Sequence, residues 1–518
     1  MSDATAKKEQ RRKFQAIRGT RDLLPPETAL WNRVEQTAHE VFATFGYGEI
    51  RSPIFEPTEL FARAVGSDTD IVSKEMYTFE SSEVPNLVEL RTYYLSSDYA
   101  EDVFHGGSED TVDLLSFATN VVGAFKKGAL PQTSENLALV DDFLKKVSQI
   151  DATQRADVLK PFREVLHNFV RSVHLGDPTA LRPEATASVC RAYLEHGMQS
   201  LPQPVKLYYI GPMFRRERPQ KGRYRQFYQI GAEVLGGTDA PAIDAEVIEM
   251  LMTYFDKVGL HGATLYINSI GHNAENCRRG YVEKLKSELA KIKDNLGPDS
   301  QRRIDTNPLR VLDSKLKSEQ PYIEKLPRIA DHLCDECKAH YAAVKRQLEL
   351  RGLLYQENWR LVRGLDYYMR TTFEITAPGL GSQNAVCGGG RYDGLVELLG
   401  GPPTKGIGFA IGEDRLILSL QEGGKGAVEQ GRDVYIAWMG EHAYAAAIRA
   451  AKDLRNAGFS VELPPVEQKF GKALGQADKL GAKYALILGD NEVAEGLWTL
   501  KTLLTGEQSF QEIGRAHV

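Results

Sequence analysis

The sequence predicts an α+β protein with a strand-rich core and a separate C-terminal α/β domain. Within residues 205–236, two runs rich in β-branched and aromatic residues flank a polar tip, which predicts a long hairpin. Residues 81–177 and 266–355 instead place apolar side chains at helical spacing, which predicts helical segments between the strand-rich parts. After a glycine-rich stretch at 421–432, the pattern alternates β-α-β-α-β, as expected for a small α/β domain.

The composition matches a globular protein of several domains. Of 518 residues, 42% are apolar and 26% are charged, and the formal net charge is −6. No apolar run reaches the ~18 residues of a membrane span, and the charged N-terminus lacks the apolar stretch of a secretory signal. Five unevenly spaced cysteines argue against a disulfide scaffold and predict a reducing, cytoplasmic location. Because the overall charge is negative, any contact with nucleic acid must be local.

The other elements follow from the same patterns, in chain order. Pro25 and Pro26 precede a helical run that begins near Thr28. Residues 50–80 predict a turn, a helix and a strand. Three helical runs are expected in residues 81–177. Since these runs contain no group of residues typical of a catalytic or binding site, a packing or partner-facing module is the favoured interpretation.

The C-terminal pattern is clear until the last eight residues. Strand runs at 433–439, 459–463 and 484–489 alternate with helical runs at 442–457 and 471–480. The final QEIGRAHV extends neither pattern and matches the translation of a common sequencing adapter. We therefore expect an artificial C-terminus.

The hairpin is the most informative part of the chain. Its tip, Arg215–Arg225, carries six basic residues and one acid, and a cationic loop between strands is suited to holding phosphate. In the return strand, period-2 alternation places Phe227, Gln229 and Glu233 on one face with Gly231. This pattern suggests the floor of a pocket that binds a small polar ligand. The alternative is a sheet face half exposed to solvent.

Two further segments place arginines where phosphate could bind. Residues 406–415 predict a strand, a glycine turn and a helix start, so Arg415 falls in the first helical turn, where free N–H groups favour an anion. Arg363 precedes Tyr367 and Tyr368 near a predicted strand and could neutralise charge on a phosphoryl group. The alternatives are a solvated arginine at the helix start and tyrosines that pack at a sheet edge.

A short acid-and-hydroxyl segment adds a possible amine site. Glu184 and Thr186, in the run RPEAT, are suited to an ammonium group. No single segment is specific, but the chain combines four of them. Each offers phosphate or amino-acid recognition, and none offers a covalent nucleophile.

The cysteines allow a metal site but do not require one. Cys334 and Cys337 form a lone CxxC pattern, and tetrahedral zinc needs two more ligands, for which Cys277 and His272 are the candidates. The favoured interpretation assigns no metal ligand. Cys190 and Cys387 are interpreted as packing residues.

Together these segments resemble the class II aminoacyl-tRNA synthetases, and the histidyl-tRNA synthetase family in particular. Three segments are similar to the class motifs: SPIFEPTELFARAVG to motif 1, FRRERPQKGRYRQFYQIGAEVLG to motif 2 and GIGFAIGEDRL to motif 3. LVRGLDYYMRTTFEI and GGGRYDGLVELLGG resemble the two segments peculiar to the histidyl family. The resemblance extends over nearly the whole chain except residues 81–177.

The resemblance implies a class II catalytic core with a six-stranded antiparallel sheet, a helical insertion and a C-terminal α/β anticodon-binding domain. It also implies a cytoplasmic homodimer built through motif 1, without membrane association. ATP and L-histidine would form histidyl-adenylate with Mg²⁺, and the histidyl group would pass to the 3′ end of tRNA(His). The expected domains are 1–80 (catalytic, motif 1), 81–177 (inserted helical module of unknown role), 178–265 (catalytic, motif 2), 266–355 (helical insertion), 356–420 (catalytic, histidine segments and motif 3), 421–432 (linker) and 433–518 (anticodon-binding).

The resemblance also implies roles for individual residues. Arg215 would contact the α-phosphate and the carboxylate, and Arg363 would face the α-phosphate in place of one metal ion. Phe227 would stack on adenine, and Arg415 would hold the γ-phosphate. The catalytic residues would be Arg363 and Arg215; the histidine-binding residues Glu184, Ala185, Thr186, Arg215, Gln229, Glu233, Arg363, Tyr367, Tyr368 and Tyr392; the ATP-binding residues Arg215, Glu217, Arg223, Phe227 and Arg415; and the tRNA-binding residue Gln220.

Three features depart from the family pattern. Ala185 stands where glycine is usual, and its methyl group could crowd the ammonium site. Asp414 replaces the usual glutamate before Arg415 and shortens a side chain there. The third departure is the insertion at 81–177, which a loop tolerates at modest entropic cost.

Two rival functions follow from the same resemblance. One is an inactive, synthetase-like regulatory subunit of ATP phosphoribosyltransferase, but such proteins usually lack the C-terminal domain and parts of motif 2 and the Arg363 segment, which this chain keeps. The other is a class II synthetase for a different amino acid. The set of Gln229, Glu233 and Tyr368 argues against it.

Overall fold

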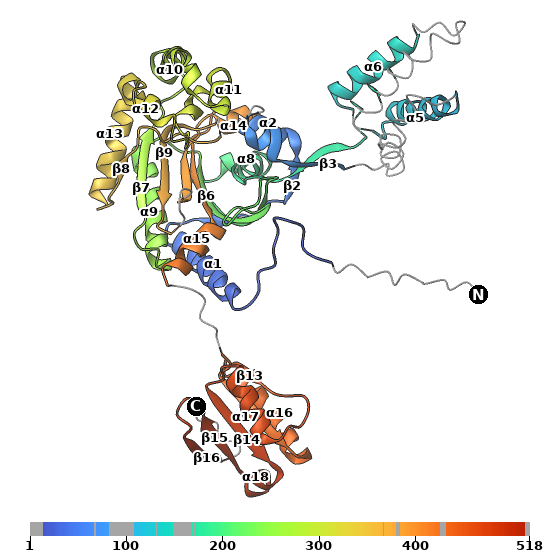
Figure 1. Cartoon of the computed structure of the whole chain (residues 1–518), viewed down its shortest axis with the longest axis vertical. Helices are drawn as coiled ribbons and strands as arrows, with labels where there is room; N and C mark the ends of the chain where they lie inside the picture. The colour runs from blue at the N-terminus through green and yellow to red at the C-terminus, as the bar shows by residue number, and fades with distance from the viewer. Residues whose placement is uncertain are drawn as a thin grey trace, which may run out of the picture. The chain divides into compact units, whose positions relative to one another are not determined.

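The fold is given by a computed structural model, shown in Figure 1. The structure describes residues 14–66, 69–81, 108–130, 132–148, 165, 168–169, 172–173, 175–365, 367–379, 384–424 and 431–512. The chain divides into two compact units. The larger comprises Met1–Asp22 and Glu35–Gly423, and the smaller comprises Leu23–Val34 and Gly424–Val518.

The larger unit is built on an eight-stranded sheet with the order β1-β5-β6-β11-β10-β9-β7-β8. Its strands are β1 (Gly48–Glu49), β5 (Val205–Phe214), β6 (Gln226–Leu235), β7 (Thr264–Ser269), β8 (Gln356–Glu357), β9 (Met369–Thr376), β10 (Ala385–Arg391) and β11 (Gly406–Gly412). The six inner strands pair antiparallel, as the resemblance implied. The two-residue strands β1 and β8 add parallel pairs at the edges.

The predicted hairpin is the pair β5 and β6, which stay in register from Val205↔Leu235 to Phe214↔Gln226. Ile230, Ala232 and Val234 are buried, as the alternation predicts. The other face is also covered, because Gln229 is 9% exposed and Glu233 is 1% exposed. The face is therefore not the half-solvated surface that was the alternative interpretation.

Helix α9 (Pro241–Val258) packs on this sheet and against α13 (Asp335–Leu350). Pro241 suits the first turn, where its missing N–H costs nothing, and Gly259 ends the helix with a left-handed φ of 82°. The sheet and its helices thus form a continuous layered core around the hairpin. Three further helices of the larger unit are α2 (Thr58–Val65), α8 (Thr186–Glu195) and α15 (Glu413–Glu422). Helix α1 (Glu27–Thr44) begins close to the expected Thr28.

The predicted helical insertion follows β7. Its helices α10 (Gly280–Lys291), α11 (Pro298–Thr306), α12 (Gln320–Ile323) and α13 gather in one part of the larger unit, as Figure 1 shows. Tyr281, Leu285 and Leu289 of α10 are fully buried and belong to the same apolar cluster as the core around α8. Because β7 reaches Ser269, the helical part begins after the expected position 266. The domain boundaries themselves stay predictions.

A small antiparallel sheet precedes the hairpin, with the order β2-β4-β3. It joins β2 (Phe55–Pro57), β3 (Tyr77–Ser81) and β4 (Asp177–Leu181). Between β3 and β4, two of the three expected helices are described, α5 (Ser108–Lys126) and α6 (Ser134–Ser148). Most of the third expected run lies outside the described residues. These helices share an apolar cluster in which the rings of Phe143 and Phe169 stack at 4.1 Å.

The smaller unit contains the predicted β-α-β-α-β alternation. Its elements are β12 (Val434–Met439), α16 (Glu441–Asn456), β13 (Val461–Glu462), α17 (Phe470–Lys479), β14 (Tyr484–Gly489), α18 (Asp490–Glu495), β15 (Leu497–Thr502) and β16 (Gln508–Glu512). β13, β12 and β14 are parallel, and β15 and β16 extend the sheet antiparallel. The expectation that QEIGRAHV extends no strand was wrong for its first two residues, which belong to β16. Residues 513–518 lie outside the described part of the chain.

Two more observations concern the ends of segments. Helix α15 reaches Glu422, so the first two residues of the expected linker are helical, and residues 425–430 lie outside the described residues. Among the described helices, none combines the length and apolar character needed to cross a membrane.

Candidate active site

A cavity of about 250 Å³ lies over the inner strands of the large sheet. It brings together eleven residues expected to form the site: Glu184, Thr186, Arg215, Glu217, Arg223, Phe227, Gln229, Arg363, Tyr367, Tyr368 and Arg415. They come from the α8 entrance, the hairpin tip, β6, the segment before β9 and the start of α15, which lie far apart in the sequence. Ala185, Glu233, Tyr392 and Gln220 do not line this cavity.

One side of the cavity is cationic and aromatic. The Arg215 guanidinium carbon lies 5.1 Å from the centre of the Phe227 ring, and Arg215 Nε donates to the Pro183 carbonyl oxygen at 2.9 Å. Glu217 lies between two cations, with Oε2 at 3.4 Å from Arg223 Nη1. The hydrogen bond to the Pro183 carbonyl oxygen fixes Arg215 beside the Phe227 ring. A ligand can therefore place an anionic group against the arginine and a flat group against the ring.

Arg415 occupies the first turn of α15, as predicted. Its Nη1 donates to the Ala385 carbonyl oxygen at 2.9 Å, and its Nε donates to the Gly222 carbonyl oxygen at 3.3 Å. Burial, with the nearby Arg223, lowers the pKa of Arg415 from its usual value. A desolvated guanidinium that neighbours other cations is well suited to bind a phosphate dianion.

Asp414 uses both of its carboxylate oxygens to bind residues outside α15. One carboxylate oxygen, Oδ1, lies 3.1 Å from Arg21 Nη2, and Oδ2 accepts the backbone N–H of Tyr228 at 3.0 Å. Burial raises the pKa of Asp414, although these two hydrogen bonds oppose the rise. Aspartate therefore joins the start of α15 to the return strand and to the segment before α1.

Arg363 enters the cavity from the segment before β9. Its Nη1 donates to Glu374 Oε2 at 3.1 Å, and its guanidinium carbon lies 5.9 Å from the centre of the Tyr368 ring. Burial opposes the charge, but the neighbouring Tyr368 and Glu374 raise the pKa of Arg363 above its usual value. A side chain at Gly388 would overlap the Arg363 guanidinium, so this glycine makes room for the cation.

Glu184 anchors the opposite wall. Its two carboxylate oxygens accept the backbone N–H groups of Thr186 at 2.8 Å and Ala187 at 3.0 Å, which caps α8. Burial raises the pKa of Glu184, and these backbone donors limit the rise. Ala185 is the residue before the helix, with an ordinary φ of −112°, so no glycine is required there by the backbone.

Glu233 lies one layer beneath the cavity. Its Oε1 accepts the Thr186 hydroxyl at 2.7 Å, and its Oε2 accepts the Tyr392 hydroxyl. Burial raises the pKa of Glu233 to about 8 against the effect of both donors. A side chain at Gly408 would overlap the Glu233 carboxylate, so this glycine gives the buried acid its space.

Several buried polar atoms at the cavity have no hydrogen-bond partner among the described residues. They include Gln229 Oε1, Tyr209 Oη and Arg363 Nε. Buried polar groups are rarely left unpaired, and each unpaired group costs about 1–3 kcal/mol. These atoms therefore mark where the polar groups of a ligand belong.

Sequence reasoning did not single out Tyr209 or Glu374, although both line the cavity. The hairpin register could have identified Tyr209, because it pairs with Gly231. Its ring fills the space that the glycine leaves. No local signal marked Glu374. Its role depends on β9 passing beside β10, which only the fold reveals.

The basic residues at the tip of the hairpin differ in their partners and in their exposure. Lys221 pairs with Glu422 at 3.0 Å, and Arg225 Nη1 donates to the Arg18 carbonyl oxygen at 3.2 Å. Gln220 is exposed, and its backbone pairs with Arg223 to close the turn. Arg216 and Arg218 are exposed as well. The outer part of the tip therefore remains open to solvent.

A second cavity, of about 580 Å³, adjoins the first. The two share Arg215, Glu217 and Arg223 in their walls. The helical insertion adds three cations to the second cavity, Arg302, Arg303 and Arg310. Arg303 and Arg310 are partly neutralised, by Asp70 at 3.1 Å and Asp313 at 3.4 Å. The second cavity is thus a positively charged entrance to the first cavity.

Comparison with known proteins identifies the family to which this arrangement belongs. A family model described as histidyl-tRNA synthetase matches residues 169–416, and one described as anticodon binding domain matches residues 433–517. The histidine--tRNA ligase of Koribacter versatilis is 46% identical over 509 residues, covering 98% of this chain and 95% of the relative. The chain belongs to the histidyl-tRNA synthetase family.

Other members of the histidyl-tRNA synthetase family agree over the full length. The histidine--tRNA ligase of Solibacter usitatus is 46% identical over 496 residues, covering 96% of each chain. The crystal structure of apo S. aureus histidyl-tRNA synthetase is 32% identical, has a TM-score of 0.65 and covers 96% of this chain and 97% of that one. Membership in the histidyl-tRNA synthetase family confirms the predicted class II catalytic core, the anticodon-binding domain and the assignment to the aminoacyl-tRNA ligases.

Proposed function

We propose that this chain joins L-histidine to tRNA(His) in two steps. In the first, the histidine carboxylate attacks the α-phosphorus of ATP, which forms histidyl-adenylate and releases pyrophosphate. In the second, a terminal hydroxyl of the tRNA attacks the histidyl carbonyl carbon, and AMP leaves. The nucleophile of each step belongs to a substrate, so the protein needs only to orient the reactants and stabilise charge.

The observation that carries this proposal is the combination of an acid at the α8 entrance with three arginines in the walls of one cavity. Glu184 supplies the anion, and Arg215, Arg363 and Arg415 supply cations from the hairpin tip, the segment before β9 and α15. An amino acid with its ammonium group at Glu184 would direct its carboxylate toward Arg215. Arg363 and Arg415 would then hold the phosphates, and Phe227 would provide a flat surface for adenine.

The histidine side chain would bind over the buried acid. Tyr367 and Tyr368 line the cavity with their ring centres 4.7 Å apart, and Tyr392 lies 5.7 Å from Tyr367. Glu233 lies beneath them, bonded to Tyr392 and Thr186. A small rearrangement that exposes this carboxyl would let it pair with an imidazole nitrogen. An isostere without the nitrogen would leave the buried acid unpaired, which is how a polar site rejects analogues.

Mg²⁺ fits the phosphate side of this site. Glu217 and Glu374 line the cavity, and carboxylate oxygens together with substrate phosphates are ligands that Mg²⁺ accepts. When bound with ATP, Mg²⁺ would neutralise part of the phosphate charge. Arg363 and Arg415 would still fix the orientation of the phosphates from the protein side.

The tRNA would approach the first cavity through the second one. Arg302, Arg303 and Arg310 line that approach, and the shared Arg215 and Arg223 link it to the site of adenylate formation. Phosphate contacts position a nucleic acid without reading its sequence. The exposed Gln220 would touch the acceptor end from the hairpin tip, and residues 433–518 would bind the anticodon.

We further propose that two copies of the chain associate through the small sheet, in the cytoplasm. Ile54, just before β2, Phe55 of β2 and Phe79 of β3 are 44%, 56% and 45% exposed, an unusual set of large apolar side chains at one small sheet. In the β2-β4-β3 register, Pro57 and Phe79 both lie opposite Thr179. Exposed apolar surfaces of this kind mark protein interfaces, and a second copy would bury them.

Exchange of radioactive pyrophosphate into ATP tests the function directly. We expect exchange that depends on histidine and on Mg²⁺, without any requirement for tRNA. Charging of a tRNA(His) transcript with labelled histidine tests the second step. No exchange at saturating histidine would contradict the proposed reaction, whereas exchange with another amino acid alone would contradict the assigned substrate.

A further inference from the structure

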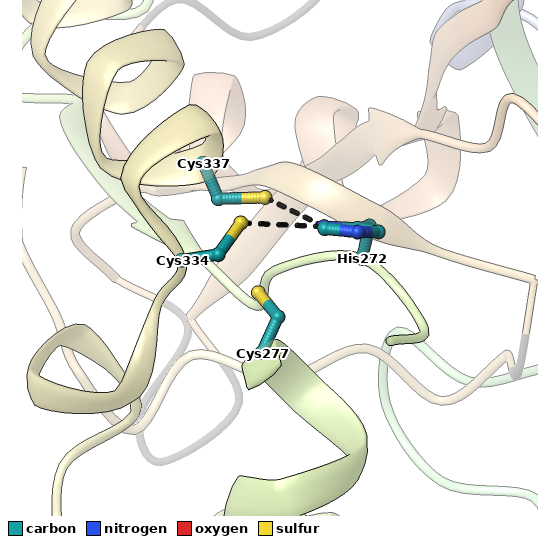
Figure 2. Close-up of side chains that lie close together, drawn as sticks. All are labelled: His272, Cys277, Cys334 and Cys337. Carbon is teal, nitrogen blue, oxygen red and sulfur yellow. Dashed lines mark hydrogen bonds between the residues drawn. The ribbon is translucent and has the colours of Figure 1, made fainter. Parts of the chain in front are cut away.

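Four potential metal ligands converge where the helical insertion begins and ends. His272 and Cys277 follow β7, and Cys334 and Cys337 lie at the start of α13, so the two pairs are about sixty residues apart in the sequence. Their ligand atoms all lie within 4.8 Å of one another. Figure 2 shows the three sulfur atoms and the imidazole ring directed toward a common centre.

The detailed geometry matches a tetrahedral metal site. His272 Nδ1 lies 3.1 Å from Cys337 Sγ and 3.7 Å from Cys334 Sγ. With Zn–S bonds of about 2.3 Å and Zn–N bonds of about 2.0–2.1 Å, ligand atoms on a tetrahedron are about 3.5–3.8 Å apart. The observed spacing is therefore close to that of bound zinc, and small shifts of the side chains would complete it.

The backbone holds these ligands in place. Cys334 precedes the first turn of α13 and Cys337 falls within it, so the start of one helix presents both thiol groups. Gly271 has a φ of 64°, and a side chain there would lie 2.7 Å from Cys277 Sγ. Only glycine allows this loop to bring Cys277 beside His272. Cys277 and Cys337 are buried, while His272 and Cys334 are partly exposed, so an ion could enter.

We propose that His272, Cys277, Cys334 and Cys337 bind one structural zinc ion. Three thiolates and an imidazole form a closed ligand set, which suits a structural zinc site and leaves no position for a substrate. The sequence-based preference for no metal rested on the need for two ligands beyond the lone CxxC pair, and the fold places His272 and Cys277 beside that pair. The inference is independent of the proposed function.

The proposed zinc would connect the insertion to the histidine pocket. Arg278, which follows Cys277, donates to the Tyr368 carbonyl oxygen, and Glu336, between the two α13 cysteines, pairs with Arg370. The Arg370 backbone N–H also donates to the Gly271 carbonyl oxygen at 2.8 Å. A bound ion would thus fix both sides of the segment that carries Tyr368.

Metal analysis of the full chain tests the proposal without relying on activity. The untagged protein should be expressed with added zinc, purified without chelators and analysed by plasma mass spectrometry. We expect about one zinc ion per chain. Replacement with Co²⁺ should give thiolate-to-cobalt charge transfer in the near ultraviolet and the strong visible bands of a tetrahedral site. Less than about 0.1 zinc per chain, with no such Co²⁺ spectrum, would overturn the proposal.

A matched set of variants locates the ion. His272→Ala and Cys337→Ser should lose most of the zinc, whereas His272→Cys should retain it, because four thiolates also form a tetrahedral set. Cys190→Ala removes a buried cysteine outside the cluster and should leave the zinc content unchanged. Full zinc content in both His272→Ala and Cys337→Ser would contradict these ligands. A disulfide among the four residues in the freshly purified wild type would contradict the site as well.

Discussion

The guanidinium of Arg363 and the carboxylate of Glu374 form an ion pair at 3.1 Å inside the cavity. Both side chains remain partly accessible, at 21% and 28% exposure. A free arginine can sample many rotamers, so a fixed acid partner reduces the cost of holding the cation where charge develops. In the proposed reaction, Arg363 acts on the α-phosphate and Glu374 positions it.

Arg363→Ala should lower the turnover number of pyrophosphate exchange far more than it changes the KM for histidine. Loss of one preorganised charge donor costs about 10²–10³-fold in kcat. Glu374→Gln keeps the arginine but loosens it, so we expect a smaller loss, on the order of tenfold. Arg346→Ala removes an exposed arginine of α13 and serves as the control. Equal changes in kcat and KM for Arg363→Ala would contradict a role in the transition state.

Gly388→Ala should reproduce much of the Arg363→Ala defect while the protein remains folded. The added methyl group would overlap the end of the flexible Arg363 side chain, which can swing away. We expect a loss of kcat of about 10²-fold and a melting temperature close to that of wild type. Gly394→Ala is the matched control in the same segment, because no atom lies within 4 Å of its added Cβ. A large loss of stability in Gly388→Ala would contradict this explanation.

Local patterns predicted the parts of the site that depend on one element. The period of β6 placed Phe227 and Gln229 on the face that lines the cavity, and the glycine turn placed Arg415 at a helix start. Both follow from backbone geometry alone. The strands β12, β13 and β14 of the smaller unit were predicted for the same reason, since each strand and helix has its own hydrophobic period.

Relationships between distant segments could not be predicted in this way. Glu374 meets Arg363 through the pairing of β9 with β10, and His272 meets Cys337 through the packing of the insertion. The edge strands β1 and β8 contain only two residues each, too few for a period to be visible. The burial of Glu233 was also missed, because alternation assigned it to a ligand-facing surface, whereas Thr186 and Tyr392 cover it.

Glu233 should make histidine binding depend on pH near 8. Because its pKa is raised to about 8 by burial, the carboxyl is protonated below that pH and ionised above it in the free protein. Thr186 and Tyr392 already donate to it, and an imidazole N–H would be a third donor, so binding favours the carboxylate. The KM for histidine should therefore fall as pH rises from 6.5 to 8.5, by up to about tenfold per unit.

Glu233→Gln should remove that dependence and weaken binding. The amide cannot ionise, so its KM should lack the change near pH 8, and its value should rise about 10–100-fold with the loss of a charged hydrogen bond. The imidazole of free histidine titrates in the same way in both experiments. The difference between the two KM profiles therefore reports the titration of Glu233 alone. The same pH profile in both proteins would show that this acid does not contact histidine.

The carboxylates of Glu35 and Glu413 should make the protein less stable as pH rises. Glu413 is fully buried at the start of α15, and neither of its oxygens has a hydrogen-bond donor among the described residues. Burial raises the pKa of Glu413 well above its usual value, and the neighbouring Glu35 raises it further; burial also raises the pKa of Glu35. A carboxyl group with a raised folded pKa keeps its proton after the unfolded chain has lost it. Its stabilising effect is therefore complete below the unfolded pKa and is lost as pH rises toward the folded one.

Glu413→Gln should consequently stabilise the protein at alkaline pH. The amide removes the cost of a buried, unpaired carboxylate, which is about 1–3 kcal/mol, so the variant should resist urea better than wild type at pH 8. The two proteins should converge at pH 5, where the wild-type carboxyl is protonated in the folded state. Glu397→Gln changes an exposed glutamate of the same unit and should behave like wild type at both pH values. If Glu413→Gln were less stable than wild type at pH 8, the Glu413 carboxylate would have to be stabilised by a partner in the folded protein. That result would contradict the prediction, because replacing an unpaired buried carboxylate should not lower stability.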